Sequence, residues 1–243
     1  MFTDLKTLYH LTLAPVRGKT HAERLESFYA GQAAAYDGFR EKLLQGRREL
    51  YQQILRAAAG GVWVDMGGGT GANLEYLGKE VRNFERVYVV DLSPSLLQVA
   101  QRRIAERGWE NVQTLEADAT QLRLPEGEQA DVVTFSYSLT MIPDWFAAID
   151  RASKLLRPGG LLGVVDFYVS RKHPAEMLTR HGLFTRTFWP FWFGLDNVHP
   201  NPDHLPYLRE RFQVRHLSEH WAKVPYLLGL KTPYYRFLGV KVD

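Results

Sequence analysis

A chain of 243 residues, 45% of them apolar, is long enough for one globular domain with additions. It contains no cysteine, which excludes disulfides and thiolate catalysis and fits a reducing compartment. The net charge of +3 permits an anionic surface as a partner but supplies no strongly basic stripe for nucleic acid. No apolar run reaches the ~20 residues that a membrane span needs, so we expect a soluble or peripheral protein.

The first 59 residues have the composition of helices. Thr20 is followed three residues later by Glu23, which is the pattern of a capping box at a helix start. Few helix-breaking residues interrupt this region, and we expect residues 1–59 to form a helical lid ahead of the main domain.

Strand and helix patterns alternate from Val62 onward. Short apolar runs predict buried strands, and the helical segments between them carry start and stop signals. Ser93 and Pro94 form a good helix start, and Arg157-Pro158-Gly159-Gly160 forms a stop. Such alternation predicts a parallel sheet with right-handed crossovers and with ligands at the carboxyl ends of its strands. The expected strands are 62–65, 86–91, 111–117, 131–136 and 161–166, and the expected helices are 71–79, 94–107 and 144–156.

A glycine turn follows the first of these strands. Gly67, Gly69 and Gly71 permit positive φ angles and a close approach of the backbone to a ligand. A nucleotide-like cofactor is the natural occupant of such a turn. The spacing Gly67-x-Gly69-x-x-Ala72 also fits the dinucleotide-binding fingerprint, so the turn alone leaves the choice of cofactor open.

Three acids at strand ends narrow that choice. Asp65 would repel the pyrophosphate of a dinucleotide but suits a cofactor with a cationic amino-acid end, such as S-adenosylmethionine. Asp91 closes the second strand and can accept hydrogen bonds from both ribose hydroxyls. Asp118 follows the third strand, where it can accept the adenine amine. The neighbours Leu92 and Ala119 complete this candidate cofactor site.

This spacing of glycines and acids resembles the class I S-adenosylmethionine-dependent methyltransferases, from about residue 60 to 167. The resemblance implies a Rossmann-like α/β fold, with a doubly wound and mostly parallel seven-stranded sheet that binds S-adenosylmethionine. Methyltransferases of this class usually end in an antiparallel hairpin, which we expect from strands near 212–219 and 233–242. The expected organisation is a single domain, with a helical lid at 1–59, a cofactor-binding core at 60–167, a substrate-side helical and aromatic insertion at 168–211 and the hairpin at 212–243.

Candidate catalytic residues lie where the transferable methyl group should sit in this fold. Ser136, a candidate cofactor-binding residue, and Tyr137 lie at the end of the fourth strand, and Tyr137 offers a phenol or a π-face. Asp166 ends the fifth strand, where it could orient an ammonium group or take its proton. In the lid, Tyr36 is a candidate to reach the methyl donor, and Arg40 is a candidate to clamp the methionine carboxylate. Loop packing, capping or a solvated helix face explains Tyr137, Asp166 and Arg40 about as well.

Histidines and aromatic residues concentrate after residue 168. Six of the eight histidines lie there, but His199 and His204 lack a convincing third ligand, so we expect no metal site. The aromatic run from Phe184 to Phe193 could form the core of a cap, an acyl-binding surface, a membrane-contact patch or a cage for a cation. Pro190 in its middle should break a simple buried helix.

Three further segments carry a narrower resemblance. They are His21-Ala-Glu-Arg-Leu-Glu-Ser-Phe-Tyr29 with Gln32-Ala33 and Tyr36-Asp37-Gly38-Phe39-Arg40, then Ser136 to Trp145, and Val224-Pro225-Tyr226-Leu227 with Pro233 to Gly239. Together they resemble the betaine-lipid N-methyltransferases, which trimethylate the amine of diacylglyceryl-homoserine. This resemblance covers nearly the whole chain and implies an amphiphilic lipid substrate and contact with a membrane surface, without nucleic acid or metal. It also implies a cytoplasmic protein, peripheral on the inner face of the cytoplasmic membrane.

Other interpretations remain open. Another amphiphile, such as phosphatidylethanolamine or a quinone precursor, could accept the methyl group, and a quinone would take it on carbon or oxygen. Aminocarboxypropyl transfer from the same cofactor would instead release methylthioadenosine. The chain could also be a non-catalytic subunit that binds only cofactor or partner, although the intact glycines and acids argue against it. A flipped base is disfavoured as substrate, because no Asn/Asp-Pro-Pro-Tyr/Phe-type motif is present.

Overall fold

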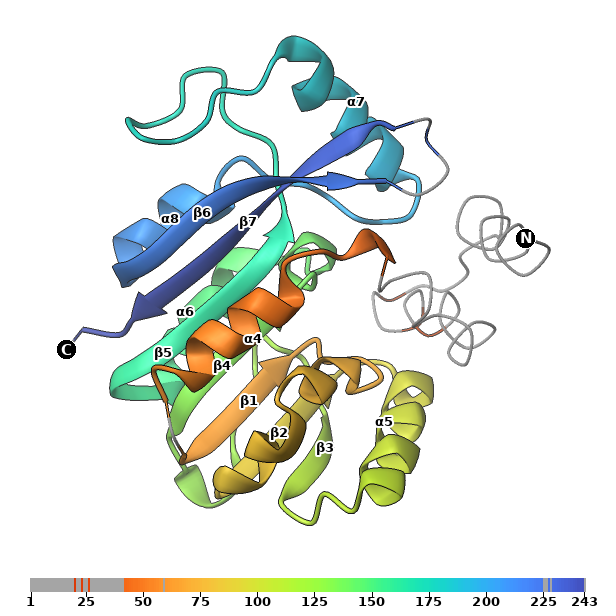
Figure 1. The fold of residues 1–243 in the computed structure, drawn as a ribbon, viewed down its shortest axis with the longest axis vertical. Helices are drawn as coiled ribbons and strands as arrows, with labels where there is room; N and C mark the ends of the chain where they lie inside the picture. Colours follow the sequence, from red (N-terminus) through yellow and green to blue (C-terminus); the bar gives the residue numbers. More distant parts are fainter. Residues whose placement is uncertain are drawn as a thin grey trace.

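Seven strands form one sheet through the middle of the protein (Figure 1). The computed structural model describes residues 20, 23, 26, 42–58, 60–224, 227 and 229–242. The strands are β1 (Val62–Met66), β2 (Arg86–Asp91), β3 (Val112–Glu116), β4 (Ala130–Ser136), β5 (Leu156–Phe167), β6 (Gln213–Lys223) and β7 (Lys231–Val240). Their order is β3-β2-β1-β4-β5-β7-β6. β7 runs in the direction opposite to the other six strands. The predicted doubly wound, mostly parallel seven-stranded sheet is confirmed.

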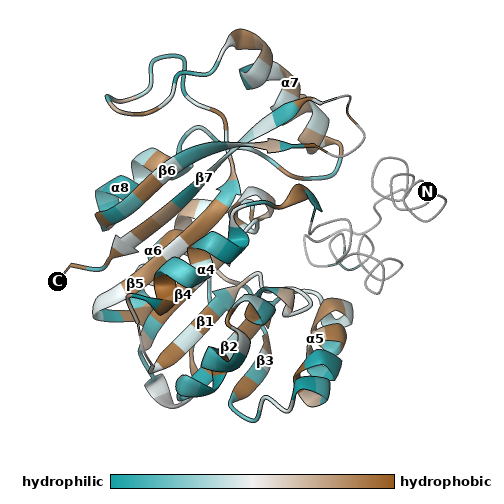
Figure 2. Ribbon diagram, in the orientation of Figure 1, coloured by the Kyte–Doolittle hydropathy of each residue, from teal (hydrophilic) through white to brown (hydrophobic). Residues whose placement is uncertain are grey.

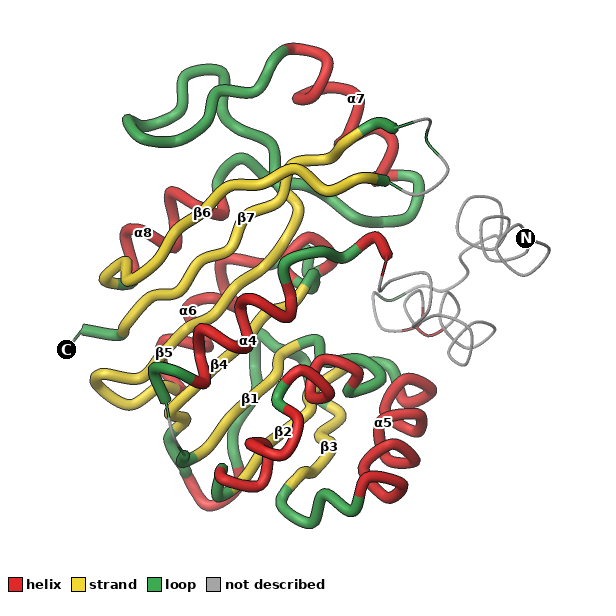
Figure 3. The backbone as a smooth tube through the Cα atoms, in the orientation of Figure 1, coloured by secondary structure: helices red, strands yellow, loops and turns green. Residues whose placement is uncertain are grey.

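Helices cover both faces of this sheet, as the tube in Figure 3 shows. They are α4 (Arg47–Leu55), α5 (Pro94–Arg107), α6 (Trp145–Leu155), α7 (Leu183–Gly194) and α8 (His204–Arg211), with the 3₁₀ helices η1 (Ala72–Tyr76), η2 (Gly78–Asn83), η3 (Pro125–Gly127) and η4 (Leu139–Met141). One apolar core includes residues of α4 and α5, and the other includes residues of α6 and α8. Alternate residues of the strands serve the two cores: Trp63 of β1 lies in the first, and Val62 and Val64 lie in the second.

Local capping signals place two helix starts where the sequence predicts them. α5 begins at Pro94, and the Ser93 hydroxyl accepts a hydrogen bond from a backbone N–H three residues on, at 3.4 Å. The side chains of Thr20 and Glu23 each accept a hydrogen bond from the other's backbone N–H, at 3.2 Å. The capping box is therefore confirmed. Most of the predicted lid at 1–59 lies outside the described residues, so its boundary stays a prediction.

The helix predicted at 71–79 is present, but as two 3₁₀ helices and not as one continuous helix. Two 3₁₀ helices, η1 and η2, occupy this stretch and extend it to Asn83. They meet at Gly78, whose φ angle of +59° cannot continue a right-handed α-helix. Leu74 and Leu77 are nevertheless buried, so the segment still covers the sheet with a different helical pitch.

The expectation that Pro190 breaks its helix is wrong. α7 runs continuously from Leu183 to Gly194 with Pro190 inside it. Proline removes one backbone hydrogen-bond donor, but Trp189 and Phe193 on either side are buried, and Phe193 stacks on Phe167 at the end of β5 with ring centroids 4.6 Å apart. Aromatic burial therefore outweighs the lost hydrogen bond.

His204, the first residue of α8, is fully buried without polar partners. Neither of its ring nitrogens has a hydrogen-bond partner among the described residues, and its ring packs edge-on against Trp145 with centroids 4.8 Å apart. Burial lowers the pKa of His204 from 6.5 to about 3, so the ring is neutral in the folded protein near neutral pH.

Replacing His204 by leucine should make the protein more resistant to acid. The unfolded chain binds a proton below pH 6.5 that the folded chain excludes down to about pH 3, so stability falls as the pH drops through that window. Between roughly pH 7.5 and 4.5, the free energy of unfolding of the wild type should fall by about 2–3 kcal/mol more than that of His204→Leu. Urea unfolding at each pH measures the two values. His173→Leu, at an exposed position, is the matched control and should leave the pH dependence unchanged. The same pH dependence in wild type and His204→Leu would contradict this account.

Candidate functional site

A cavity of about 320 Å³ opens at the carboxyl ends of β1 to β4. The strand order reverses here, since β2 and β3 lie on one side of β1 and β4 lies on the other, and ligands of doubly wound sheets bind at such a point. The predicted residues Gly67, Gly69, Asp91, Leu92, Asp118, Ala119 and Tyr137 all line this cavity. The rest of the described wall is Leu96, Ala117, Thr120, Gln121, Ser138 and residues 141–144.

The glycine turn after β1 requires glycine for two physical reasons. Gly67, Gly69 and Gly71 have φ angles of +69°, +57° and +69°, which residues with a Cβ rarely adopt. At Gly67, a Cβ would also lie 2.4 Å from the Cβ of Ser138 on the facing loop. Gly67 and Gly69 line the cavity, whereas Gly71 lies off the wall at the start of η1. The turn therefore presents bare backbone to a ligand.

Asp91 is held in one orientation at the end of β2. One carboxylate oxygen accepts a hydrogen bond from the Gly69 N–H and the other accepts one from the Ser93 N–H, both at 2.9 Å. A carboxylate oxygen can accept more than one hydrogen bond, so this geometry suits the two hydroxyls of a ribose. Glu26 accepts a hydrogen bond from the Ser93 hydroxyl at 2.6 Å, which places Glu26 at the edge of the site.

Asp118 is fixed by the turn that follows β3. Its Oδ1 accepts hydrogen bonds from the backbone N–H and the hydroxyl of Thr120, both at 2.8 Å. Asp118 and Ala119 lie on the cavity wall next to Gln121. The carboxylate is thus oriented toward this end of the cavity, and its contact with an adenine amine stays a prediction.

Asp65 lies behind the cavity wall, where it is fully buried. Its oxygens accept hydrogen bonds from the hydroxyls of Tyr51 and Thr134, each at 2.8 Å, and from the Asn73 amide at 3.2 Å. Burial raises the pKa of Asp65, and the three hydrogen bonds oppose that rise by stabilising the carboxylate. The acid thereby ties β1 to α4, β4 and η1, and its predicted contact with the cationic end of the cofactor remains untested.

The polar partners of Asp65 were not predicted from the sequence. Arg47 is buried and donates a hydrogen bond to the Asn73 side-chain oxygen at 3.2 Å. The Ser136 hydroxyl donates to the same oxygen at 3.4 Å, so this predicted cofactor residue lies in the buried network and not on the cavity wall. The available signal was Thr134, a polar residue between the apolar residues Val133 and Phe135 of β4.

Tyr137 lines the wall from a strained backbone position. Its φ angle is +55°, a left-handed value that costs a residue with a side chain on the order of 1–3 kcal/mol. Its hydroxyl donates to the backbone carbonyl of Gln45 at 2.6 Å, and burial raises its pKa well above 10.0. The phenol is therefore neutral and already engaged, and the ring packs edge-on against Phe167 with centroids 4.6 Å apart. A catalytic role for Tyr137 stays a prediction.

Asp166 supports the loop after β4 from the neighbouring strand. It is fully buried, and its oxygens accept hydrogen bonds from the Thr140 N–H at 3.1 Å, the Thr140 hydroxyl at 2.8 Å and the Phe167 N–H at 2.8 Å. Burial raises the pKa of Asp166 to about 7, so the group can exchange a proton near neutral pH. Asp166 lies behind the wall that Met141 lines, and its direct action on a substrate stays a prediction.

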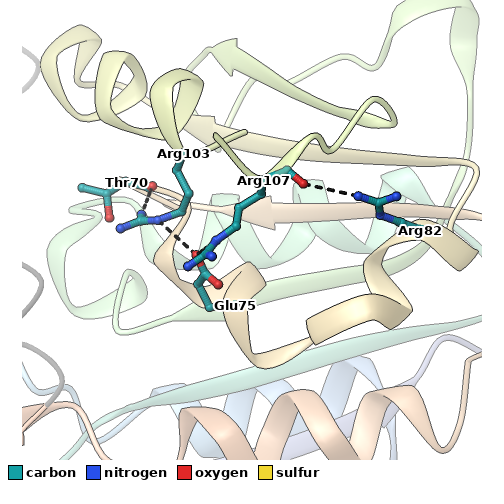
Figure 4. Close-up of polar contacts among 5 residues, drawn as sticks. All are labelled: Thr70, Glu75, Arg82, Arg103 and Arg107. Carbon is teal, nitrogen blue, oxygen red and sulfur yellow. Dashed lines mark hydrogen bonds and ion pairs between the residues drawn. The ribbon is translucent and has the colours of Figure 1, made fainter. Parts of the chain in front are cut away.

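Two arginines of α5, Arg103 and Arg107, bind the glycine turn and the 3₁₀ helix η1 that follows it (Figure 4). Arg103 donates a hydrogen bond to the backbone carbonyl of Thr70 and lies 3.6 Å from the carboxylate of Glu75. Arg107 forms an ion pair with the same carboxylate at 2.9 Å. The turn is thus attached to α5 as well as to β2 and β4, so the cavity wall is positioned before a ligand binds.

Tyr36 and Arg40, predicted to reach the cofactor from the lid, lie outside the described residues. Within the described part of the chain, no group of three or more His, Asp or Glu side chains is arranged to hold a metal ion. The helices that the structure describes include none with the length and apolarity needed to cross a bilayer.

Comparison with known proteins identifies methyltransferases as relatives of this chain. Residues 64–164 match a family model described as a methyltransferase domain. The chain is 27% identical over 210 residues to a ubiquinone/menaquinone biosynthesis C-methyltransferase of Teredinibacter turnerae, a match that covers 84% of this chain and 82% of that protein.

Two solved structures illustrate the likeness in fold. A methyltransferase dependent on S-adenosylmethionine from Aquifex aeolicus has a TM-score of 0.57 at 15% identity, covering 87% of this chain and 98% of that one. The phosphoethanolamine N-methyltransferase 2 of Haemonchus contortus, solved with phosphomonomethylethanolamine and S-adenosylhomocysteine, has a TM-score of 0.69 at 14% identity, covering 93% of this chain and 61% of that one.

The named relative is a quinone C-methyltransferase and not a betaine-lipid N-methyltransferase, so the narrower resemblance is not confirmed. The broader assignment rests on consistent observations. Only backbone without a Cβ fits at Gly67, Asp91 is held in one orientation on the cavity wall, and the cavity lies at the reversal point of the sheet. The matched family and relatives are methyltransferases. The chain is an S-adenosylmethionine-dependent methyltransferase with the class I fold.

Proposed function

We propose that this methyltransferase methylates the amine of a polar lipid head group at a membrane surface, with diacylglyceryl-homoserine as the first candidate acceptor. One observation carries the proposal: the charged side chains on the described wall of the cavity are all carboxylates, from Asp91, Asp118 and Asp144. The described wall contains no lysine, arginine or histidine. Such a wall attracts cationic ligands and repels anionic ones.

The charge of the wall suits both molecules in the proposed reaction. S-Adenosylmethionine supplies a methyl group on a positively charged sulfur, and an amine acceptor gains positive charge as it is methylated. Tyr137 also lines this wall, and contact of a methylated ammonium with its π-face would contribute about 0.5–2 kcal/mol. With Asp91 and Asp118 assigned to the cofactor, Asp144 is the carboxylate of the described wall left to face the acceptor, so an amine acceptor without phosphate fits this wall better.

The chain's residues prepare the amine for attack by positioning and by exclusion of water. An amine with a pKa near 10 is mostly protonated at neutral pH, and only the neutral form has the lone pair that attacks the methyl carbon. Leu96, Met141 and Ile142 give the wall an apolar part that favours the neutral amine. Asp144 is exposed at the cavity mouth, where a proton that leaves the amine can pass to water.

A quinone precursor is the second candidate acceptor. The Teredinibacter turnerae relative is named a ubiquinone/menaquinone biosynthesis C-methyltransferase, and that likeness covers 84% of this chain. Both candidates are amphiphiles, so they differ in the methylated atom and in the charge of the acceptor. A neutral quinone ring gains nothing from carboxylates on the wall, whereas an amine does.

Incubation of the full chain with labelled S-adenosylmethionine and a panel of acceptors tests the proposal. We expect diacylglyceryl-homoserine to gain one, two and three methyl groups by mass spectrometry. Asp144→Asn should raise KM for the amine acceptor and leave KM for a quinone precursor unchanged. Methylation on a ring carbon would establish the second candidate instead, and release of methylthioadenosine would reveal aminocarboxypropyl transfer. Cofactor binding without incorporation into any lipid amine would refute the proposed acceptor.

A further inference from the structure

The outer face of α7 is an exposed apolar surface. Leu183, Phe184, Phe191 and Leu195 are 70%, 58%, 69% and 57% exposed, and we call these four residues the α7 stripe. At 3.6 residues per turn they fall within about a third of the helix circumference. Figure 2 shows hydrophobic segments along α7. A contiguous apolar face of this kind on a soluble protein marks a surface that binds a partner.

The inner face of the same helix is packed against the domain. Trp189 and Phe193 are 1% and 5% exposed. Phe193 stacks on Phe167, and Phe167 packs edge-on against Tyr137, with ring centroids 4.6 Å apart in both pairs. A row of aromatic contacts therefore runs from α7 to the cavity wall. The packed inner face fixes the helix in place, so the stripe is presented on a rigid support.

The segment that leads into α7 carries more exposed basic than acidic side chains, while the partly buried Asp196 follows Leu195 at the other end of the stripe. α7 itself contains no acidic residue. The loop from β5 to α7 presents Lys172 and Arg180, both exposed, against the single acid Glu176. Arg171 in the same loop pairs with Asp203 at 2.6 Å. An apolar stripe beside exposed cations complements a surface that offers acyl chains below phosphate groups.

We propose that the α7 stripe inserts into the surface of a lipid bilayer that contains anionic lipids. With 12 residues, α7 is far shorter than the ~20 residues of a membrane-spanning helix, so it would lie in the interface, where phenylalanine and leucine enter the acyl region. A second copy of the chain fits the surface less well, because pairing two stripes about a twofold axis would bring Lys172 and Arg180 of both copies close together.

The inferred bilayer contact also orients the cavity. The aromatic row from Phe193 to Tyr137 connects the bilayer-facing helix with the cavity wall. A head group at the membrane surface would then be close to the cavity while its acyl chains stay in the bilayer. This delivery of an acylated acceptor rests on the proposed function, whereas binding of the bilayer does not.

Flotation of the full chain with vesicles tests the docking surface. The wild type should float with phosphatidylcholine vesicles that contain phosphatidylglycerol, and less with pure phosphatidylcholine or at high salt. The combined Phe184→Ser and Phe191→Ser variant should bind on the order of tenfold less. Phe146→Ser is the matched control, because Phe146 is an exposed phenylalanine of α6 and its loss should leave flotation unchanged. S-Adenosylmethionine affinity should stay at the wild-type value in both variants, which shows that they fold.

A second pair of variants tests the electrostatic contribution to vesicle binding. Lys172→Glu combined with Arg180→Glu should weaken flotation with phosphatidylglycerol vesicles, while Arg102→Glu, at an exposed position of α5, should not. The proposal is overturned if the wild type does not float with anionic vesicles or if the two-serine variant floats as well as the wild type. It is also overturned if the wild type is a dimer that the two-serine variant converts to a monomer.

Activity on a detergent-dispersed acceptor separates this proposal from the proposed function. The two-serine variant should methylate a dispersed acceptor at the wild-type rate while it fails to bind vesicles. Intact vesicle binding without methylation of any lipid amine would refute the acceptor and leave the docking surface standing.

Discussion

Asp91→Ala should raise the dissociation constant for S-adenosylmethionine at least about 100-fold. Hydrogen bonds to a charged group contribute about 1.5–3 kcal/mol each, and the substitution removes the acceptor of both ribose hydroxyls. The same carboxylate accepts hydrogen bonds from Gly69 and Ser93, so its loss also removes one of the contacts that hold the glycine turn to β2, next to the backbone bonds of the turn to the Val90 carbonyl. Isothermal titration calorimetry with S-adenosylmethionine measures the change directly.

A matched variant separates this effect from a general loss of negative charge. Glu110→Ala removes an acid from an exposed position and should leave the dissociation constant unchanged. Thermal unfolding of Asp91→Ala shows whether the protein remains folded at the titration temperature. An affinity equal to that of the wild type would mean that the ribose binds somewhere other than the end of β2.

Asp65→Ala should lower the free energy of unfolding by about 3–5 kcal/mol, because three buried donors lose their acceptor at once. The donors are the hydroxyls of Tyr51 and Thr134 and the amide of Asn73, all inside the protein. For a chain of this length the expected fall in melting temperature is about 10 °C. Urea unfolding and calorimetry provide the two measurements.

Removal of one donor in place of the acceptor is the control. Tyr51→Phe should cost only about 1 kcal/mol, because the Asp65 carboxylate keeps its bonds to Thr134 and Asn73. The double variant should lose less stability than the sum of the single variants, since one of the orphaned donors is then absent. A loss in Asp65→Ala no larger than that in Tyr51→Phe would show that the buried donors find other acceptors.

The junction between β2 and α5 could be predicted from the sequence because its determinants are neighbours in the chain. Asp91 ends an apolar run, and Ser93 and Pro94 provide the cap and first turn of the next helix. The turn at Gly67 and Gly69 is local in the same sense, since the backbone angles themselves demand glycine. These two stretches contribute most of the predicted residues that meet at the cavity.

The hydrogen-bond partners of Asp65 could not be predicted from such local patterns. Its hydrogen-bond partners Tyr51, Thr134 and Asn73 lie 14, 69 and 8 residues away in the chain. Whether a strand-end acid faces a cavity or the interior depends on which helix packs over it, and α4 supplies the covering residue here. Pro190 failed as a helix breaker for a related reason, because tertiary packing of aromatic rings overrides a local propensity.

The place of β7 in the sheet has a consequence for the order of folding. β7 pairs with β5 on one side and β6 on the other, yet its residues 231–240 leave the ribosome after every other strand. Until then β6 has no neighbour to join, and β5 exposes an unpaired edge on the nascent chain. The sheet is therefore complete only after β7 has been synthesised. Until then the unpaired edge of β5 is open to misassembly, and this edge is where a chaperone would act.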